Sequence, residues 1–352
     1  MAVPESAKTV TLIEHIPEGI PGPEHFAIHQ TAAPTAAALQ DGEVLVRVTH
    51  MSADPYLRSG CKSEAKGGAV PRPMKGFVVA SVVESKRPGV EAGDLIGADL
   101  PFTTIQVLPK GAFLWSLGKH LSPERASLGV GILGMPGSTA YGGLLGVLRP
   151  KKKLGPADAP ETIWISGAAG AVGSLVGQIA KQIFGCTVIG SCGGPDKGKL
   201  IKTKFGFDHA IDYKMVSTAE ELAAKVKECA PEGIDMYFDN VGGLHFEAAM
   251  MVLRKRGRVA ICGAISRYNK AERQPERFFP ADMIYNFHRI EGFTCLPWLT
   301  GAQGNFLEDM AGWLQDGKLV VEETVFDGIE QWPLAFRALF TGANTGKVVI
   351  KM

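Results

Sequence analysis

The chain has almost no net charge. Its 37 lysines and arginines balance 36 aspartates and glutamates, which gives a formal net charge of +1 at pH 7. A nucleic-acid-binding domain normally carries a basic surplus, so no nucleic-acid partner is expected. With 45% hydrophobic and 21% charged residues, the 352-residue chain has the composition of a globular protein. Its length predicts two domains of ordinary size.

The sequence also lacks a long uninterrupted apolar run. The one candidate, ASLGVGILGMPGSTAYGGLLGVL at 126–148, is broken by Pro136 and several glycines. It predicts two helical pieces joined at 135–137 rather than a membrane helix. The first ten residues, MAVPESAKTV, do not have the cationic and apolar pattern of a secretory signal. We therefore expect a cytoplasmic protein with no membrane segment.

Paired cysteines are absent as well. The six cysteines are scattered, with no C-x-x-C pair: Cys61, Cys186, Cys192, Cys229, Cys262 and Cys295. This spacing predicts reduced thiols. None of the eight histidines completes a close His/Cys set of the kind that binds zinc, so no metal site is expected.

What the sequence does contain is a change of pattern near residue 140. Before it, strand-like segments at 43–49, 76–83 and 95–98 are separated by Pro and Gly turns, which predicts an antiparallel, barrel-like domain. After it, strands alternate with helices, which predicts an α/β domain with a doubly wound, six-stranded parallel sheet. The expected strands are 162–166, 187–191, 209–212, 235–239, 258–262 and 289–295, and the expected helices are 171–184, 197–205, 217–229, 244–254 and 303–316. The tail, with a helix at 330–340 and a last strand, should return to the first domain. The predicted domains are 1–140 with 318–352, and 141–317.

A glycine-rich segment, ISGAAGAVGSLVG at 165–177, joins the first of these strands to its helix. At such a turn the helix N-terminus offers backbone N–H groups to a phosphate, and Gly170 lets the phosphate approach. Gly173 lets the helix lie close to the strand. Ala168 takes the place of the first glycine in the G-x-G-x-x-G pattern. Packing alone would explain Gly173 but not Gly170, so the segment predicts a dinucleotide site.

The next strand end indicates which dinucleotide is bound. A carboxylate there would hold the ribose diol of NAD, but 190–194 reads GSCGG. Lys197 follows shortly after, and an ammonium group at this place favours the 2′-phosphate of NADP(H). Alternatively, Lys197 is an ordinary solvated residue in the first turn of a helix. The residues alone leave both possibilities open.

Five segments together resemble a known family. They are MSADPYLR at 51–58, AAGAVGS at 168–174, FDNVGG at 238–243, ICGAISRYN at 261–269 and NTGK at 344–347. The chain is similar, over nearly its whole length, to the zinc-free medium-chain dehydrogenases/reductases, and within them to the prostaglandin reductase, leukotriene B4 dehydrogenase and alkenal double-bond reductase group. Where the zinc-dependent branch would have a Gly-His-Glu ligand segment, this sequence has MKGF at 74–77.

The resemblance implies a GroES-like catalytic domain, a Rossmann domain, and NADPH-dependent reduction of the C=C bond of an α,β-unsaturated carbonyl compound. It also implies a homodimer formed near 290–295. The implied cofactor contacts are Gly170, Ala171, Val172, Gly173, Lys197, Tyr213, Asn240, Cys262, Gly263, Ala264, Ile265, Ser266, Tyr268, Phe293, Thr294, Cys295 and Asn344. Three segments depart from the family pattern: GGPD at 193–196, the polar, Gly-rich CKSEAKGGAV at 61–70, which does not have the character of a defined substrate wall, and RFFP at 277–280, which we expect to form an individual loop.

A mechanism follows from this resemblance. Hydride would reach the β-carbon of the enone or enal, and a neutral phenol would stabilise the charge that develops on the carbonyl oxygen. Tyr268 is the first candidate for this donor and Tyr56 the second, although either could simply be a packing aromatic. Two other functions remain open: a quinone reductase of the same fold, and a non-catalytic NADPH-binding protein.

Overall fold

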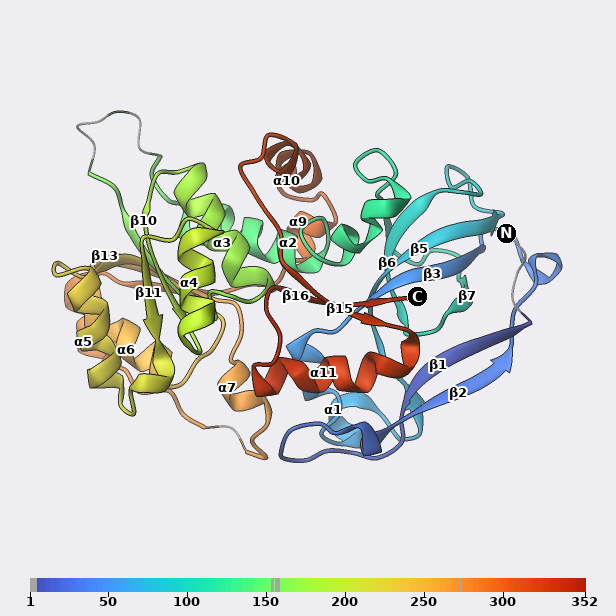
Figure 1. Ribbon diagram of the computed structural model, residues 1–352, viewed down its shortest axis with the longest axis horizontal. Coiled ribbons are helices and arrows are strands. Elements are labelled where there is room, and N and C mark those ends of the chain that lie inside the picture. Colours follow the sequence, from blue (N-terminus) through green and yellow to red (C-terminus); the bar gives the residue numbers. More distant parts are fainter. Residues whose placement is uncertain (1–4, 153–154, 156–158, 273) are drawn as a thin grey trace. The chain divides into compact units, whose positions relative to one another are not determined.

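The computed structural model describes residues 5–152, 155, 159–272 and 274–352. The chain divides into two compact units. Unit 1 comprises Met1–Met135, Asn269–Ala271 and Glu323–Met352, and unit 2 comprises Pro136–Tyr268 and Glu272–Glu322. Figure 1 shows the course of the chain through both.

Unit 1 contains two sheets. The larger has the order β15-β16-β3-β5-β6-β8, with β7 also paired to β3, and the smaller has the order β2-β1-β4. The strands are β1 Ser6–Leu12, β2 Phe26–Ala32, β3 Val44–Ser52, β4 Arg72–Pro73, β5 Lys75–Ser85, β6 Leu95–Pro101, β7 Ile105–Leu108, β8 Leu114–Ser116, β15 Glu323–Asp327 and β16 Lys347–Lys351. Strand pairing is antiparallel, as the sequence predicts, except that β15 and β16 run parallel. That exception arises because helix α11, Trp332–Thr341, carries the chain back between them.

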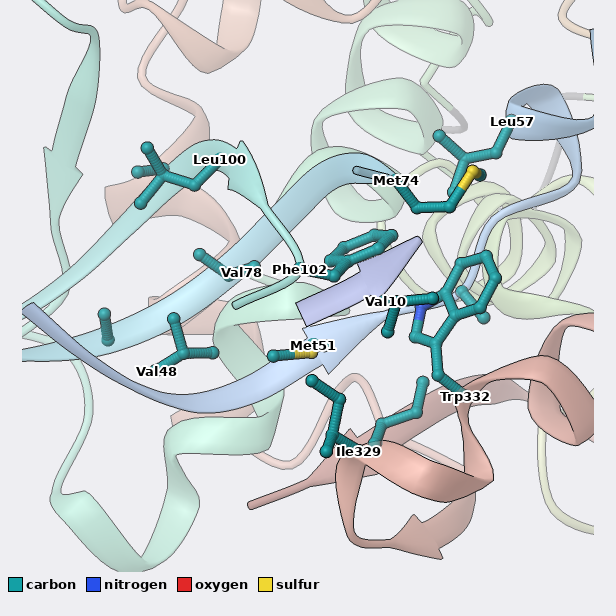
Figure 2. Close-up of a cluster of buried hydrophobic side chains, with 14 of the residues drawn as sticks. Val10, Val48, Met51, Leu57, Met74, Val78, Leu100, Phe102, Ile329 and Trp332 are labelled. Carbon is teal, nitrogen blue, oxygen red and sulfur yellow. The ribbon is translucent and has the colours of Figure 1, made fainter. Parts of the chain in front are cut away.

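The core of unit 1 forms where these strands meet α11 (Figure 2). The core includes Val10 on β1, Met51 on β3 and Val78 on β5. Because side chains alternate between the two faces of a strand, these three face inward, and each is fully buried. Trp332, at the start of α11, is also fully buried. Its indole donates a hydrogen bond to the backbone oxygen of Ser52, at 3.2 Å. The polar edge of this large ring is therefore satisfied inside the core.

The shorter helical pieces of unit 1 connect its strands. They are the 3-10 turns Pro23–His25, Ala36–Ala38, Pro55–Ser59, Pro123–Val130 and Ile329–Gln331, and the one-turn helix α1, Glu64–Gly67. Helix α2, Met135–Tyr141, and the π-helix Gly142–Leu148 follow at the junction with unit 2. The break in the 126–148 segment falls at 131–134, so the predicted join at 135–137 is wrong in position: these residues begin α2. None of the described helices is long and apolar enough to cross a membrane.

Unit 2 has a six-stranded parallel sheet in the order β11-β10-β9-β12-β13-β14 within the described residues. The strands are β9 Thr162–Ser166, β10 Thr187–Cys192, β11 His209–Asp212, β12 Ile234–Asp239, β13 Leu253–Ile261 and β14 Arg289–Gly292. The order reverses between β9 and β12, and ligands of such sheets bind outside the carboxyl ends of the strands at that point. The predicted doubly wound α/β fold is confirmed.

Helices cover both faces of this sheet (Figure 1). The helices of unit 2 are α3 Ala171–Gln182, α4 Pro195–Thr203, α5 Ala219–Cys229, α6 Leu244–Val252, α7 Ile265–Tyr268, α8 Pro280–Asn286, α9 Leu296–Leu299 and α10 Phe306–Gln315, with a 3-10 turn at Tyr213–Met215. Local sequence sets where they begin. At α5, for example, the Thr218 hydroxyl accepts the backbone N–H of Glu221, and the Glu221 carboxylate accepts the backbone N–H of Ser217. The pair is a variant of the capping box, in which the carboxylate accepts the N–H of the residue before the N-cap Thr218.

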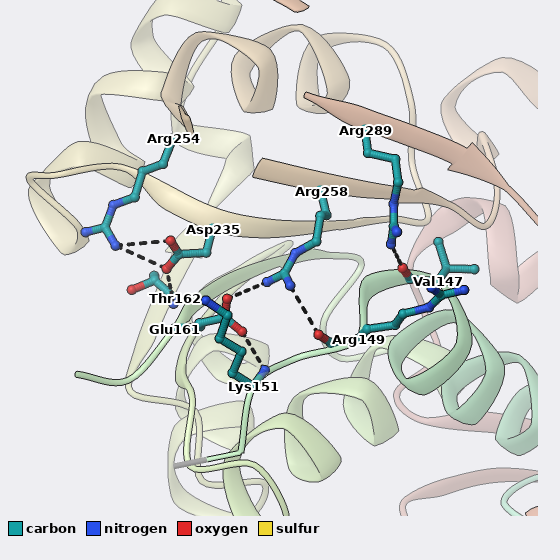
Figure 3. Close-up of polar contacts among 9 residues, drawn as sticks. All are labelled: Val147, Arg149, Lys151, Glu161, Thr162, Asp235, Arg254, Arg258 and Arg289. Atoms are coloured by element: carbon teal, nitrogen blue, oxygen red, sulfur yellow. Dashed lines mark hydrogen bonds and ion pairs between the residues drawn. The ribbon is translucent and has the colours of Figure 1, made fainter. Parts of the chain in front are cut away.

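Polar side chains tie the amino ends of these strands together (Figure 3). Arg254 pairs with Asp235 at 3.1 Å, and Arg258 pairs with Glu161 at 2.7 Å. Asp235 also accepts the backbone N–H of Thr162, at 2.7 Å, which links β12 to β9. At this end of the sheet, charged side chains therefore link β9, β12 and β13.

Three sequence predictions about unit 2 are wrong in detail. β14 ends at Gly292 rather than at 295, because its partner β13 ends at Ile261, opposite Gly292. β13 begins at Leu253, directly after α6, with a register irregularity before Arg258. The segment 277–280 does not stay a loop to its end, because Pro280 begins α8. Proline suits the first turn of a helix, where its missing N–H would have no partner.

Candidate cofactor and active site

The glycine turn lies at the carboxyl end of β9. Gly167 has a positive φ of 63°, and Gly170 is the N-cap of α3 in an extended conformation. A Cβ on Gly170 would come within 4 Å of one atom only, the backbone oxygen of Gly167, at 3.2 Å. The first N–H groups of α3 have no acceptor inside the helix. The turn therefore presents backbone donors beside a position that has no side chain, which fits a pyrophosphate.

Gly173 has the packing role that the sequence predicts. A Cβ there would lie 2.4 Å from the backbone oxygen of Gly167 and 2.9 Å from the Cα of Ala168. Ala168, which replaces the first glycine of the fingerprint, is fully buried, and its N–H donates to the backbone oxygen of Ser191 on β10. The substitution is accommodated because Gly190 faces it: a Cβ on Gly190 would lie 2.7 Å from that of Ala168.

Two lysines and a tyrosine gather at the ends of β10 and β11. Burial lowers the pKa of Lys197, and the charge of Lys214 lowers it further, while the Cys192 thiol acts in the opposite direction. A Cβ on Gly193 would lie 2.9 Å from the Cε of Lys214 and 3.2 Å from the Oη of Tyr213. Two like charges held close together are a suitable site for a phosphate dianion, which would relieve their repulsion.

Asp212 is not available as the ribose-binding carboxylate of an NAD site. Its Oδ1 accepts the backbone N–H of Gly194, at 2.9 Å, and that of Lys214, at 3.1 Å. The carboxylate thus fixes the turn before α4, whose N-cap Gly194 has a positive φ of 93°. This arrangement favours NADP(H) over NAD, the question that the residues alone left open.

Asn240 follows directly after β12 and lies beside the glycine turn. Its Nδ2 donates to the backbone oxygen of Ser166 at 2.7 Å, and its backbone N–H donates to the Ser166 hydroxyl at 2.9 Å. A Cβ on Gly167 would lie 3.5 Å from that of Asn240. The predicted contacts of β9 and β12 are therefore brought together at the point where the strand order reverses.

The segment 262–268 runs along the end of β12. The backbone N–H groups of Cys262 and Gly263 donate to the backbone oxygen of Asp239, at 2.9 and 3.0 Å. Those of Ile265 and Ser266 donate to the backbone oxygens of Asn240 and Val241. Burial raises the pKa of the Cys262 thiol well above its usual range. Cys262 therefore stays protonated and is not a nucleophile.

Tyr268 ends this segment and turns back on it. Its Oη accepts the backbone N–H of Ala264 at 3.2 Å, so the phenol proton is not used in that bond. The same oxygen would lie 3.1 Å from a Cβ on Gly263. Burial raises the pKa of Tyr268 above its ordinary value of 10.0, with smaller contributions from Cys262 and Asp239 in the same direction. The hydroxyl is therefore a neutral donor at physiological pH.

The predicted contacts after β14 are of mixed character. Phe293 packs edge-to-face on Phe238 and Trp298, with ring centroids 6.0 and 6.2 Å away. Thr294 is exposed. The backbone oxygen of Cys295 accepts the N–H groups of Trp298 and Leu299 at the start of α9. The structure therefore shows that Phe293 packs against the neighbouring aromatic rings.

Two predicted residues belong to unit 1. Tyr56 lies in the 3-10 turn Pro55–Ser59 with 42% of its surface exposed. The residue before this turn, Asp54, is buried and pairs with the buried ammonium of Lys347 at 2.8 Å. Asn344 lies in the turn before β16, and its Nδ2 donates to the backbone oxygen of Gly346 at 3.4 Å.

Sequence reasoning missed two residues of this site. Lys214 stands next to Tyr213 in the chain, but only the pairing of Cys192 with Asp212 brings it to the turn before α4. Asp239 was part of the FDNVGG motif but was given no role, although it is buried at the end of β12. A carboxylate that ends an apolar strand was the available signal.

The described residues do not fit a metal site. Within that part of the chain, no three His, Cys, Asp or Glu side chains come together in a way that could hold a metal ion. Lys75, in the segment where a zinc ligand would stand, instead pairs with Asp99 at 3.1 Å.

Comparison with known proteins gives the family. The profile of the N-terminal domain of oxidoreductase matches residues 8–116, and that of zinc-binding dehydrogenase matches residues 171–305. Prostaglandin reductase 1 of Mus musculus is 39% identical over 347 residues, covering 98% of this chain and 99% of its own. This chain belongs to the medium-chain dehydrogenases/reductases, in the group of the prostaglandin and alkenal reductases.

Two further proteins are similar to this chain over nearly its whole length. The 2-alkenal reductase (NADP(+)-dependent) of Nicotiana tabacum is 35% identical over 354 residues, covering 99% of this chain and 98% of its own. The crystal structure of CurA in complex with NADPH from Vibrio vulnificus superimposes with a TM-score of 0.84 at 35% identity, covering 98% of this chain and 99% of that one. The family resemblance inferred from the five motifs is confirmed.

Proposed function

We propose that this protein reduces the C=C bond of α,β-unsaturated ketones or aldehydes with NADPH. The observation that carries the proposal is Tyr268, a neutral, largely buried phenol held by the Ala264 N–H beside the end of β12. The names of the relatives, a prostaglandin reductase and an NADP-dependent 2-alkenal reductase, support the same reaction.

Unit 2 is the proposed NADP-binding domain and unit 1 the proposed catalytic domain. The α3 N-terminus from Gly170 to Gly173 would bind the pyrophosphate, because it offers backbone donors without a Cβ in the way. Lys197, Lys214 and Tyr213 would bind the 2′-phosphate. Asn240 and the segment 262–268 would line the nicotinamide half, and Asn344 would contribute from unit 1.

When bound, NADPH would supply the hydride that reaches the β-carbon, and a proton would later reach the α-carbon to complete the saturated product. Between these two steps the protein must stabilise negative charge on the carbonyl oxygen. Tyr268 is the proposed donor to that oxygen, directly or through a ribose hydroxyl, because its own proton is free of the Ala264 contact. Tyr56 is the proposed second donor on the substrate side, since its ring is partly exposed on a short turn. No step requires a metal.

The experiment uses the purified full chain and NADPH with deuterium at the transferable position. We expect a medium-chain 2-alkenal and an enone to be converted to the saturated carbonyl compounds, with deuterium at the β-carbon. A saturated aldehyde of the same length is the matched control and should not be consumed. NADH should be a much poorer donor.

The same experiment separates the other functions. Rapid turnover of a short quinone without any alkenal product would favour the quinone reductase. Tight NADPH binding without turnover of any compound would favour the non-catalytic protein. A stoichiometric tight zinc ion in the purified protein would contradict the metal-free assignment.

The proposed assembly is a homodimer formed through β14. Among the described strands, β14 is an edge of the parallel sheet. The neighbouring helix α8 exposes Ile284 and Tyr285, at 66% and 76%, and Phe287 after it is 60% exposed. An apolar surface of this kind beside an open strand edge suits a second copy. Light scattering should give twice the chain mass, and Tyr285→Glu should reduce it to the mass of one chain, whereas a change at the exposed Leu334 of α11, Leu334→Glu, should not.

The proposed location is the cytoplasm. The described cysteines form no disulfide, as expected for a reducing compartment. Fractionation of cells that express the tagged chain would check it.

A further inference from the structure

Asp239, the last residue of β12, is almost completely buried, with 1% of its surface exposed. Among the described residues, four donors point at its Oδ1. They are the Tyr237 hydroxyl at 2.8 Å, the Ser166 hydroxyl at 3.2 Å, and the backbone N–H groups of Val241 at 3.0 Å and Gly242 at 2.8 Å. All four donors are neutral. The carboxylate therefore acts as a shared acceptor rather than as half of an ion pair.

Two of these bonds shape the turn that follows the strand. A carboxylate that accepts the N–H groups two and three residues ahead closes an Asx-type turn. The chain leaves this turn through Gly242 and Gly243, whose φ angles of 68° and 57° are positive. The Asp239 side chain thus fixes the backbone directly after Asn240, at Val241 and Gly242.

Backbone hydrogen bonds join this turn to the segment 262–268, which ends in Tyr268. Four backbone N–H groups of that segment, those of Cys262, Gly263, Ile265 and Ser266, donate to the backbone oxygens of residues 239–241. The Ser266 hydroxyl adds a bond of 2.6 Å to the backbone oxygen of Val241. Tyr268 then accepts from Ala264 within the same segment. A displacement of the turn would therefore displace the phenol.

Ser166 links the same carboxylate to the glycine turn. Its hydroxyl accepts the backbone N–H of Asn240 at 2.9 Å and can donate to Asp239 at 3.2 Å. Its backbone oxygen accepts the Asn240 side chain at 2.7 Å. Gly167, the next residue, begins the glycine turn.

We propose that Asp239 is a positioning residue: through its Oδ1 it holds Asn240 and the 262–268 segment in the geometry that places Tyr268. The inference rests on the proposed function, because it gives Tyr268 the role of donor. Asp239 itself is not placed in contact with substrate or cofactor.

The ionisation of the neighbouring groups agrees with this role. Burial raises the pKa of Tyr237 well above its usual range, so its hydroxyl stays a donor to Asp239. Burial also raises the pKa of Asp239, and the hydrogen bonds from Gly242, Val241, Tyr237 and Ser166 oppose that rise. These bonds are what make the buried carboxylate tolerable.

The test compares three variants of the full chain. Asp239→Asn keeps an Oδ1 acceptor for the two backbone N–H groups, whereas Asp239→Leu has a similar size and no acceptor. Asp235→Leu is the matched control, because Asp235 stands at the other end of the same strand and also accepts a backbone N–H and pairs with an arginine. For each variant, thermal unfolding, the NADPH dissociation constant, and kcat and KM for the enone are measured at a temperature where all are folded.

We expect Asp239→Leu to lower kcat by about 10- to 100-fold and to weaken NADPH binding, because small displacements of catalytic groups have effects of that size. Asp239→Asn should restore most of kcat. Asp235→Leu should lose stability but keep kcat. If Asp239→Leu does not fold, Ser166→Ala should show a smaller loss of kcat in the same direction.

Three outcomes would overturn the inference: a folded Asp239→Leu protein with wild-type kcat, an Asp239→Asn protein as impaired as Asp239→Leu, or an equal loss of kcat in Asp235→Leu. The NADPH measurement needs no turnover. A wild-type protein that binds NADPH but reduces no enone would contradict the proposed function, while the change in NADPH affinity on Asp239→Leu would still test the positioning of Asn240.

Discussion

At the amino end of the parallel sheet in unit 2, β9, β12 and β13 are joined by side-chain ion pairs such as Arg254–Asp235 and Arg258–Glu161 (Figure 3). At the carboxyl end β9 and β12 are joined by Asp239 and Ser166 through hydroxyls and backbone N–H groups. The turns at this end contain Gly167, Gly194 and Gly242, all with positive φ. Both ends bury polar groups, but with different chemistry.

The difference shows what each end can do. Arginines and carboxylates that neutralise each other leave no binding capacity for a ligand. Backbone N–H groups at glycine turns can approach a ligand closely, and at this end the charge of Lys214 lowers the pKa of Lys197. The amino end is therefore suited to stability and the carboxyl end to ligand binding. Substitutions at the two ends should have separable effects.

The largest effect is expected from Gly173→Ala. Its Cβ would lie 2.4 Å from the Gly167 backbone oxygen, so α3 must move away from β9. We expect a loss of about 1–3 kcal/mol or more in the free energy of unfolding, together with loss of NADPH binding. Gly170→Ala is the matched variant: its Cβ would make only one tight contact, at 3.2 Å, so it should fold and yet bind NADPH weakly. Calorimetry with and without NADPH measures both. Normal NADPH affinity in folded Gly170→Ala would contradict the pyrophosphate site.

Next comes Tyr268→Phe, which removes the proposed donor. Loss of one oxyanion donor lowers rates by about 10²–10³-fold, so kcat for an enone should fall by that factor while NADPH affinity changes little. Burial raises the pKa of Tyr268 above 10.0, so the wild-type rate should show no loss from this phenol until the pH exceeds 10. Above the raised pKa the donor proton is gone and the rate should drop. Stopped-flow kinetics across this pH range checks it, and an unchanged rate in Tyr268→Phe would remove the assignment.

A smaller effect is expected from Lys197→Ala. A hydrogen bond to a charged group contributes about 1.5–3 kcal/mol, so NADPH affinity should fall about 10- to 100-fold. NADH affinity should hardly change, because NADH has no 2′-phosphate. Lys214→Ala should follow the same pattern if its charge adjoins the same phosphate, as its influence on the pKa of Lys197 indicates. Fluorescence titration with both nucleotides measures the ratio, and equal losses for NADPH and NADH would contradict the phosphate site.

The order of strands and helices in unit 2 could be predicted from the sequence, because each of these patterns depends only on residues that are close together in the chain. The glycine turn, the fold class and the family are confirmed, whereas the roles of individual site residues stay predictions. What could not be predicted depends on partners distant in the chain. The end of β14 at Gly292 is set by where β13 ends, and the place of Lys214 is set by the pairing of β10 with β11. The role of Asp239 depends on Ser166, which is 73 residues away.

The smallest effect on activity is expected at the amino end of the sheet. Glu161→Gln keeps the shape of the side chain but removes the charge, and its single amide oxygen can accept from either Arg258 or the Lys151 backbone N–H, not from both. Arg258 and Glu161 are largely buried, so the loss in the free energy of unfolding should be about 1–2 kcal/mol, more than for an exposed pair. Neither kcat nor NADPH affinity should change, because the ligand-binding turns lie at the other end of the strands. Urea unfolding and steady-state kinetics on the same preparation measure both quantities. A drop in kcat without a drop in stability would show that the two ends are coupled, and the separation drawn between them would be wrong.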